Sequence, residues 1–105
     1  MSDVVLVLTT VPDDPRAEPF ARALVEERLA ACVHLHTPMT SIYRWKGDVT
    51  RDAERQVVVK TTRACLPALE TRLKTLHPYE LPELVVIAID EGSAAYLEWV
   101  KAEVS

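Results

Sequence analysis

The fold of this chain is decided by residues 32–62, which read CVHLHTPMTSIYRWKGDVTRDAERQVVVKTT. Branched and aromatic residues flank the pair Gly47-Asp48, which is suited to a tight two-residue loop. The stretch therefore predicts a β-hairpin, with Pro38 at an edge or a bulge because proline donates no hydrogen bond to a ladder. One strand phase holds the apolar residues Val33, Leu35, Met39, Tyr43 and Trp45.

The length of this hairpin is itself informative. Each arm runs to about a dozen residues, whereas strands in globular proteins are usually about 5–6 residues long. We expect the arms to extend beyond their own sheet and to pair with a neighbouring molecule. The hairpin is therefore a first indication that the chain oligomerises.

The residues before the hairpin predict one strand and one helix. Residues 4–11 are aliphatic and β-branched, which is typical of a buried strand, and the following PDDP interrupts it. The helix begins either at Pro15, with Asp14 as its cap, or later at Pro19. Apolar residues recur at helical spacing from Phe20 and predict a helix to about Ala31.

The residues after the hairpin predict a helix, a strand and a terminal helix. The first helix runs from about residue 65 or 67 to 76, and the strand covers residues 84–89. Ser93 is suited to cap the last helix, whose residues Tyr96, Trp99 and Val100 we expect to face inward. The whole order is βαββαβ plus a short C-terminal helix. This order predicts an α+β fold, a ferredoxin-like sandwich in which two helices cover one face of a four-stranded antiparallel sheet.

The composition is that of an ordinary soluble globular protein. The chain has 105 residues, 49% hydrophobic and 27% charged, with a formal net charge of −4. This length predicts one domain spanning residues 1–105, and the absence of a basic stripe predicts no nucleic-acid partner. The first residues carry no leader signal, and no segment reaches the ~20 apolar residues of a membrane span. We therefore expect a cytoplasmic protein with no membrane partner.

Four stretches of the chain are similar to a known protein family. They read LTTVPDD (8–14), LVEERLAACV (24–33), TSIYRWKGDV (40–49) and LHPYELPE (76–83). In this order and spacing they resemble the CutA divalent-cation tolerance proteins. The resemblance implies a ferredoxin-like fold, a tight homotrimer with exchanged hairpins, and a role in tolerance of copper and other divalent metals. The CutA architecture in turn resembles that of the PII signalling proteins, trimers that bind small ligands in clefts between subunits.

The resemblance also implies a candidate metal ligand, His77. Some bacterial relatives carry a metal-binding cysteine and a further histidine at positions that are Thr9 and Leu76 here, so His77 is the one such ligand retained. A neutral imidazole binds copper or another divalent metal well. The alternative is a helix-terminal histidine that complements the last carbonyls, with Pro78 as the helix stop.

A second candidate metal site is the pair His34 and His36. The two residues lie two apart on a predicted strand, so their side chains share a face, and trimer symmetry could bring three copies together. The alternative is that both belong to the solvent-exposed face of a half-buried strand.

A candidate intersubunit cleft combines the hairpin with residues 77–83. Tyr43 and Trp45 would line it, and Lys60 would supply a charge for an anionic ligand, with Glu83 as its partner. Tyr79 would add a hydroxyl from a segment that two prolines make rigid. The alternative is simple interface packing, because aromatic residues are enriched at interfaces.

The sequence does not predict an enzyme. His77 with Glu80 or Glu83 could transfer a proton, but the chain has no nucleophile motif and no glycine-rich phosphate loop. The sequence thus predicts a non-catalytic CutA-like homotrimer that binds divalent metal weakly. The alternative is a PII-like trimeric sensor that takes a small anion or nucleotide in an intersubunit cleft and signals to a partner protein.

Overall fold

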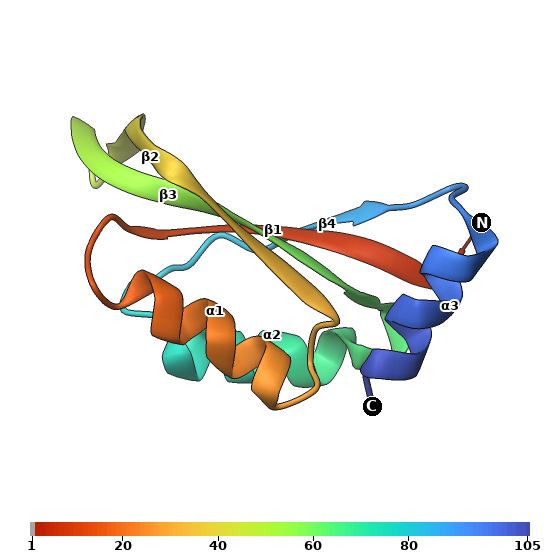
Figure 1. The fold of residues 1–105 in the computed structure, drawn as a ribbon. Helices are drawn as coiled ribbons and strands as arrows, with labels where there is room; N and C mark the ends of the chain where they lie inside the picture. Colours follow the sequence, from red (N-terminus) through yellow and green to blue (C-terminus); the bar gives the residue numbers. More distant parts are fainter. Residues whose placement is uncertain (1) are drawn as a thin grey trace.

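The computed structural model describes residues 2–105 as one four-stranded sheet with three α-helices. The elements, in chain order, are β1 (Val4–Pro12), α1 (Ala17–Glu26), β2 (Cys32–Trp45), β3 (Asp48–Thr62), a 3₁₀ turn (Arg63–Cys65), α2 (Leu66–Leu76), β4 (Val85–Ala88) and α3 (Ala94–Glu103). The strands lie in the order β2-β3-β1-β4 with antiparallel pairing throughout. Both α1 and α2 lie on one face of the sheet, which confirms the predicted ferredoxin-like α+β sandwich (Figure 1). Within residues 2–105, no helix combines the length and the apolar character that crossing a bilayer requires.

The core lies between the sheet and the helices α1 and α2. Every second side chain of β1, from Val5 to Val11, is buried against these helices, as the two-residue period of a strand requires. We call this the covered face of the sheet and the other side the open face, because neither α1 nor α2 lies over it (Figure 1). The other fully buried residues of this core are Leu24, Val57, Val59, Leu69 and Leu73.

The ends of α1 differ from the prediction. The helix begins at Ala17, and it ends at Glu26 rather than near residue 31. Arg28 has a φ of 60°, a left-handed conformation that an α-helix does not contain. The N–H of Leu29 donates to the carbonyl of Leu24 at 3.0 Å, which closes the helix in a Schellman-type end. Leu29 keeps the helical apolar spacing because it packs on the same core from beyond the helix.

The turn of the β2–β3 hairpin is Lys46-Gly47, one residue earlier than the predicted Gly47-Asp48. Trp45 pairs with Asp48 across it. Both central residues have positive φ, 48° for Lys46 and 88° for Gly47, which defines a type I′ turn. Glycine occupies the second central position, where φ is the more positive of the two, because it has no Cβ and adopts positive φ without steric cost.

A bulge in β2 changes which side chains share a face. Leu35 pairs with Val57, but Pro38 pairs with Arg55, so β2 contains one extra residue between them. The prediction that Pro38 sits at an edge or a bulge is confirmed on both counts. The prediction of a single apolar phase is wrong, because the extra residue moves the rest of the strand to the other phase. Thus Val33 and Leu35 pack on the core, whereas Met39, Tyr43 and Trp45 lie on the open face.

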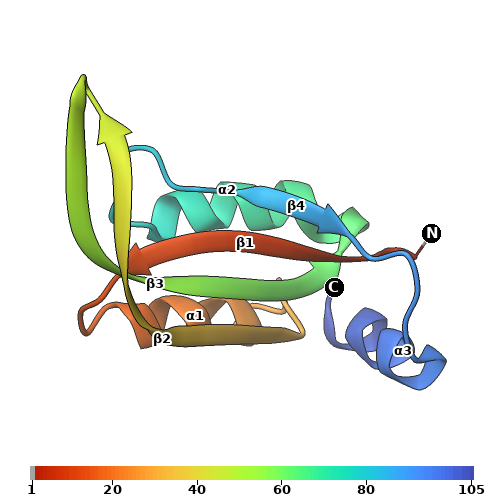
Figure 2. The same ribbon diagram turned by 90° about the horizontal axis from the view of Figure 1, so that it is seen from above.

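The terminal helix α3 packs at the end of the sheet far from the hairpin tip (Figure 2). Ser93 caps it by accepting a hydrogen bond from the N–H of Tyr96 at 3.4 Å, as predicted. Val100 is fully buried beside Val4. The expectation that Tyr96 and Trp99 face inward is wrong, since they are 41% and 43% exposed and contact each other, with ring centroids 5.6 Å apart. Because α3 contacts only the end of the sheet, it buries one row of side chains, that of Val100, and leaves its other sides exposed.

Candidate functional site

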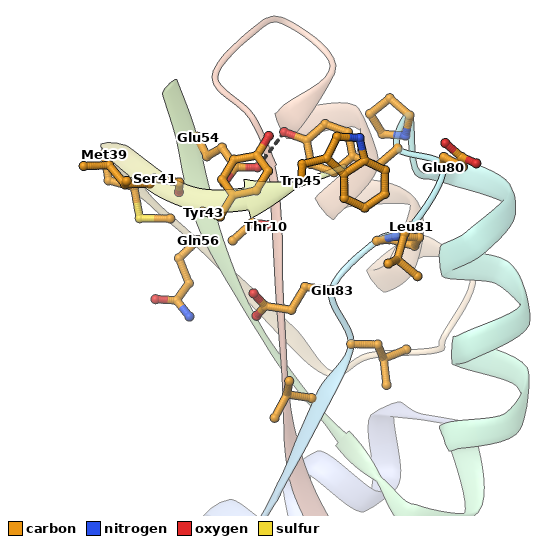
Figure 3. Close-up of a pocket in the computed structure, with 16 residues that line it drawn as sticks. Thr10, Met39, Ser41, Tyr43, Trp45, Glu54, Gln56, Glu80, Leu81 and Glu83 are labelled. Carbon is orange, nitrogen blue, oxygen red and sulfur yellow. Dashed lines mark hydrogen bonds between the residues drawn. The ribbon is translucent and has the colours of Figure 1, made fainter. Parts of the chain in front are cut away.

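A pocket of about 910 Å³ lies on the open face of the sheet, beside the hairpin (Figure 3). This volume falls in the range of small-molecule sites, roughly 300–1,000 Å³. Its walls are the sheet, the hairpin, and the connection between α2 and β4. We call it the hairpin pocket; it is lined by Thr10, Met39, Ser41, Ile42, Tyr43, Trp45, Glu54, Gln56 and residues 78–85.

Two tyrosines are held at this pocket by carboxylates of β3. The hydroxyl of Tyr79 donates to Oε2 of Glu54 at 2.6 Å (Figure 3). The hydroxyl of Tyr43 donates to Asp52. Burial, followed by the bond to Glu54, raises the pKa of Tyr79 well above its usual range. The bond to Asp52 raises the pKa of Tyr43. Both hydroxyls therefore stay protonated at neutral pH and can donate these hydrogen bonds.

His77 follows the last residue of α2 and is buried behind the pocket wall. Its Nε2 donates to the carbonyl of Thr10 at 2.6 Å, and its Nδ1 accepts the N–H of Tyr79 at 3.1 Å. Burial lowers its pKa, so the imidazole is neutral, as these two bonds require. The ring contacts the edge of Phe20, with centroids 5.5 Å apart. His77 thus ties the connection after α2 to β1, instead of complementing the last carbonyls of its own helix.

These contacts bear on the residues proposed for proton transfer. His77 directs both ring nitrogens to backbone groups, so neither bonds to Glu80 or Glu83. Glu80 instead lies 3.8 Å from Lys46 of the hairpin turn, an exposed ion pair. The segment 77–83 is therefore a structural joint that also forms one wall of the pocket. The sequence predicted both roles for it.

Lys60 lies apart from this pocket of the single chain. Four of the five predicted cleft residues do line it, namely Tyr43, Trp45, Tyr79 and Glu83. Lys60 pairs with Leu6 near the other end of the sheet, and its Nζ lies 3.1 Å from the hydroxyl of Tyr96 and 5.2 Å from the centre of that ring. Its partner is therefore a tyrosine of α3 rather than Glu83. Sequence reasoning could not foresee this, because it required the placement of α3.

The remaining predicted ligands lie apart from the pocket lining. His34 and His36 are exposed on the edge strand β2, where His34 pairs with Val58. Thr9, at the position of the relatives' cysteine, is fully buried on the covered face, and its hydroxyl has no hydrogen-bond partner in the described part of the chain. Across residues 2–105, no three His, Cys, Asp or Glu side chains are gathered closely enough to hold a metal ion.

Sequence reasoning missed Glu54, the least exposed of the three glutamates that line the pocket. It lies on β3 opposite Met39 and is only 6% exposed. The sequence carried one usable signal, an acidic residue only three positions before the run of three valines at 57–59. The bulge at Pro38 hid its position, because it determines which hairpin residues share a face with Glu54.

Comparisons with known proteins agree with this fold. The family model described as CutA1 divalent ion tolerance protein matches residues 5–103. The divalent-cation tolerance protein CutA of Thermus thermophilus is 50% identical over 101 residues, which cover 96% of each chain. Human protein CutA is 42% identical over 92 residues, 88% of this chain and 51% of the human one. The crystal structure of CutA from Xylella fastidiosa superposes with a TM-score of 0.94 at 43% identity, over 99% of this chain and 100% of the other.

Proposed function

The chain belongs to the CutA1 divalent ion tolerance family, and on this premise we propose that it acts as a non-catalytic homotrimer that binds divalent metal ions weakly. The names of the family and of its curated relatives refer to divalent cations, which supports a role linked to metal. They describe tolerance rather than a chemical reaction, which supports binding rather than catalysis. The observation in this chain that carries the proposal is an edge strand, β2, that presents two exposed histidines.

Assembly is supported by the hairpin. β2 is the outermost strand, and no other strand of residues 2–105 pairs with its free edge. The side chains near the tip include Ile42, which is 70% exposed, and Val49, which is 68% exposed. An open edge with exposed apolar residues favours pairing with another copy of the chain. A head-to-tail contact between hairpin and neighbour closes after three copies if each copy is turned by about 120°.

Metal binding is supported by the location of His34 and His36. Both imidazoles are exposed on β2, so assembly along this strand can place histidines of different copies near one another. A single chain offers too few gathered ligands within its described residues, which accounts for weak binding by one copy. His77 is the poorer ligand, because a metal would have to displace one of its two hydrogen bonds.

The anion-binding alternative receives less support. Lys60, the cation on which it depended, lies beside Tyr96 instead of in the hairpin pocket. The ionisable residues that line the pocket are Glu54, Glu80, Glu83 and two tyrosines, a set that repels phosphate and nucleotides.

The test is calorimetric titration of the metal-stripped protein with Cu²⁺ and Zn²⁺, on samples whose mass is measured by light scattering. We expect a mass about three times the 11.8 kDa of one chain and saturable binding that disappears at pH 5 as imidazole protonates. The double variant His34→Ala/His36→Ala should lose this binding. The matched control, His77→Gln, should keep it.

A monomeric mass at micromolar concentration would contradict the assembly. Flat titrations, or unchanged binding in the double variant, would contradict the metal site. The light-scattering result separates these two outcomes. A trimeric mass with flat titrations would support the proposed assembly and contradict only the proposed metal binding.

A further inference from the structure

The helix α3 and the two residues after it bury little of themselves against the rest of the chain. We call residues 94–105 the strap. Among these described residues, Val100 is the one buried side chain, and it packs with Val4 and Ala31 in a small cluster that is separate from the main core. The connection before the strap, residues 89–93, contains no helix or strand. A segment with so few buried apolar contacts belongs to the part of a protein that opens at the lowest cost in free energy.

Arg28 fastens the strap to the end of α1. Its Nη2 donates to the carbonyl of Ala102 at 3.0 Å, and its own carbonyl accepts the N–H of Ser105 at 3.1 Å. The first bond satisfies one of the last carbonyls of α3, which an α-helix leaves without a partner of its own. One residue thus holds the strap with both its side chain and its backbone.

The backbone conformation of Arg28 costs free energy that this contact offsets in part. Arg28 stands where the chain turns left-handed after α1, with a φ of 60°. Glycine is the usual residue at such a helix end, because it has no Cβ, and an arginine is less favourable there. The guanidinium bond to Ala102 works against this cost, and it exists only while the strap is closed.

A buried thiol lies beneath the strap. Cys65, immediately before α2, is 4% exposed, and its Sγ lies 3.7 Å from the carbonyl oxygen of Ser105. The carbonyl oxygens of Leu29 and Arg28 lie 3.6 and 4.0 Å from the same sulfur. Cys65, Val104 and Ser105 also line one hollow of about 460 Å³. Figure 1 shows the chain end after α3 beside the start of α2, so the strap forms part of the wall between Cys65 and solvent.

We propose that the strap is a hinged cover that opens without unfolding the sheet, and that Arg28 is the latch that determines how often it opens. Opening about residues 89–93 breaks both bonds of Arg28 and withdraws Val100 and Ser105 together. A thiol-reactive molecule then reaches Cys65. The main core beneath α1 and α2 keeps its packing in the open state, because Val100 belongs to the separate cluster.

This device is independent of the proposed metal binding. It lies at the end of the sheet far from the hairpin tip (Figure 2), and neither His34 nor His36 takes part in it. The variant His34→Ala/His36→Ala should therefore leave the opening of the strap unchanged.

The test is labelling of Cys65 by iodoacetamide in native buffer, a reaction in which the thiolate displaces iodide and forms a thioether. Mass spectrometry of the labelled peptides counts Cys65 and Cys32 separately. Arg28→Gly should label at Cys65 about tenfold faster than the unmodified protein, because it removes a charge-assisted hydrogen bond that only the closed state makes. The midpoint of urea unfolding should not fall with it, since glycine favours the left-handed turn in the open and the closed state alike.

The matched control is Arg72→Gln. Arg72 lies on α2 and donates to both carboxylate oxygens of Glu27, the neighbour of Arg28, at 2.7 and 2.9 Å. It therefore ties the same end of α1 to α2 rather than to the strap. Its loss should leave the labelling rate of Cys65 within about twofold of the original.

Hydrogen exchange of the unmodified protein checks the opening without any substitution, and it decides the question if a variant does not fold. The amides of residues 98–103 should exchange at least about tenfold faster than those of β1, which is paired on both sides.

Faster labelling in Arg28→Gly but not in Arg72→Gln, together with early exchange of the strap, supports the proposal. Unchanged labelling of Cys65 in Arg28→Gly overturns it. So does equal acceleration in Arg72→Gln, which would indicate general loosening of α1, or exchange of the strap and β1 at one common rate, which would mean that the strap opens only when the whole chain unfolds.

Discussion

The two faces of the sheet are built from the same strands but meet different neighbours. On the covered face, alternate residues of β1 and β3 are fully buried beneath α1 and α2. On the open face, Leu6 and Leu8 are only half-buried, and Val85 and Ile87 of β4 are exposed. The chain covers one face with its own helices and leaves the other without such cover, and it is to this open face that our proposals assign further copies and a ligand. The covered face therefore determines stability, and the open face carries the candidate interactions.

The largest difference between the faces should appear on truncating a leucine. Leu73→Ala removes a fully buried side chain of α2 from the covered face and should lower the free energy of unfolding by about 3 kcal/mol. Leu81→Ala, at a residue 70% exposed on the rim of the hairpin pocket, should change it by less than about 0.5 kcal/mol. Urea unfolding at equal chain concentration measures both. Similar losses in the two variants would contradict the division between the faces.

A smaller effect of opposite sign is expected at Thr9. Its hydroxyl is buried on the covered face without a partner from residues 2–105, so Thr9→Val replaces an unsatisfied polar atom by a methyl group of similar size. We expect the free energy of unfolding to rise by about 1 kcal/mol. Thr10→Val, at the next residue on the open face, is the control and should be close to neutral. A destabilised Thr9→Val protein would mean that the hydroxyl has a partner in solution.

The smallest effect concerns pH and the histidine that is buried at the end of α2, His77. Burial lowers the pKa of His77 below the ordinary 6.5, so the unfolded chain takes up a proton first as the pH falls. The stability that depends on neutral His77 is fully present above about pH 6.5 and decreases below it. In His77→Gln, the free energy of unfolding should be lower at pH 7.5 and should fall less steeply towards pH 5. An unchanged slope in His77→Gln would contradict the assignment of this pH dependence to His77.

Much of the fold could be predicted from local patterns. The buried strand β1, the leucine stripe of α2, the cap at Ser93 and the bulge or edge at Pro38 each follow from spacing or from one residue's backbone chemistry. The end of α1 could not be predicted, because Leu29 continues the helical spacing although it lies beyond the helix.

The candidate site was predicted only in part, for a similar reason. Tyr43, Trp45, Tyr79 and Glu83 were recognised as a group because of their chemistry and the resemblance to CutA proteins, and they do share one pocket. Glu54 was missed because a bulge elsewhere on the paired strand determines which residues face it.

By itself, the sequence determined the order of the elements, the long hairpin and the rigid segment 77–83, because these depend on the periodicity of a few neighbouring residues and on the fixed torsion of proline. Only the tertiary structure decided that Lys60 lies beside Tyr96, that His77 bonds to β1, and that Glu54 is buried in the pocket without a basic partner from residues 2–105. These are contacts between residues far apart in the chain. They depend on strand register and on the docking of α3, which no local pattern encodes.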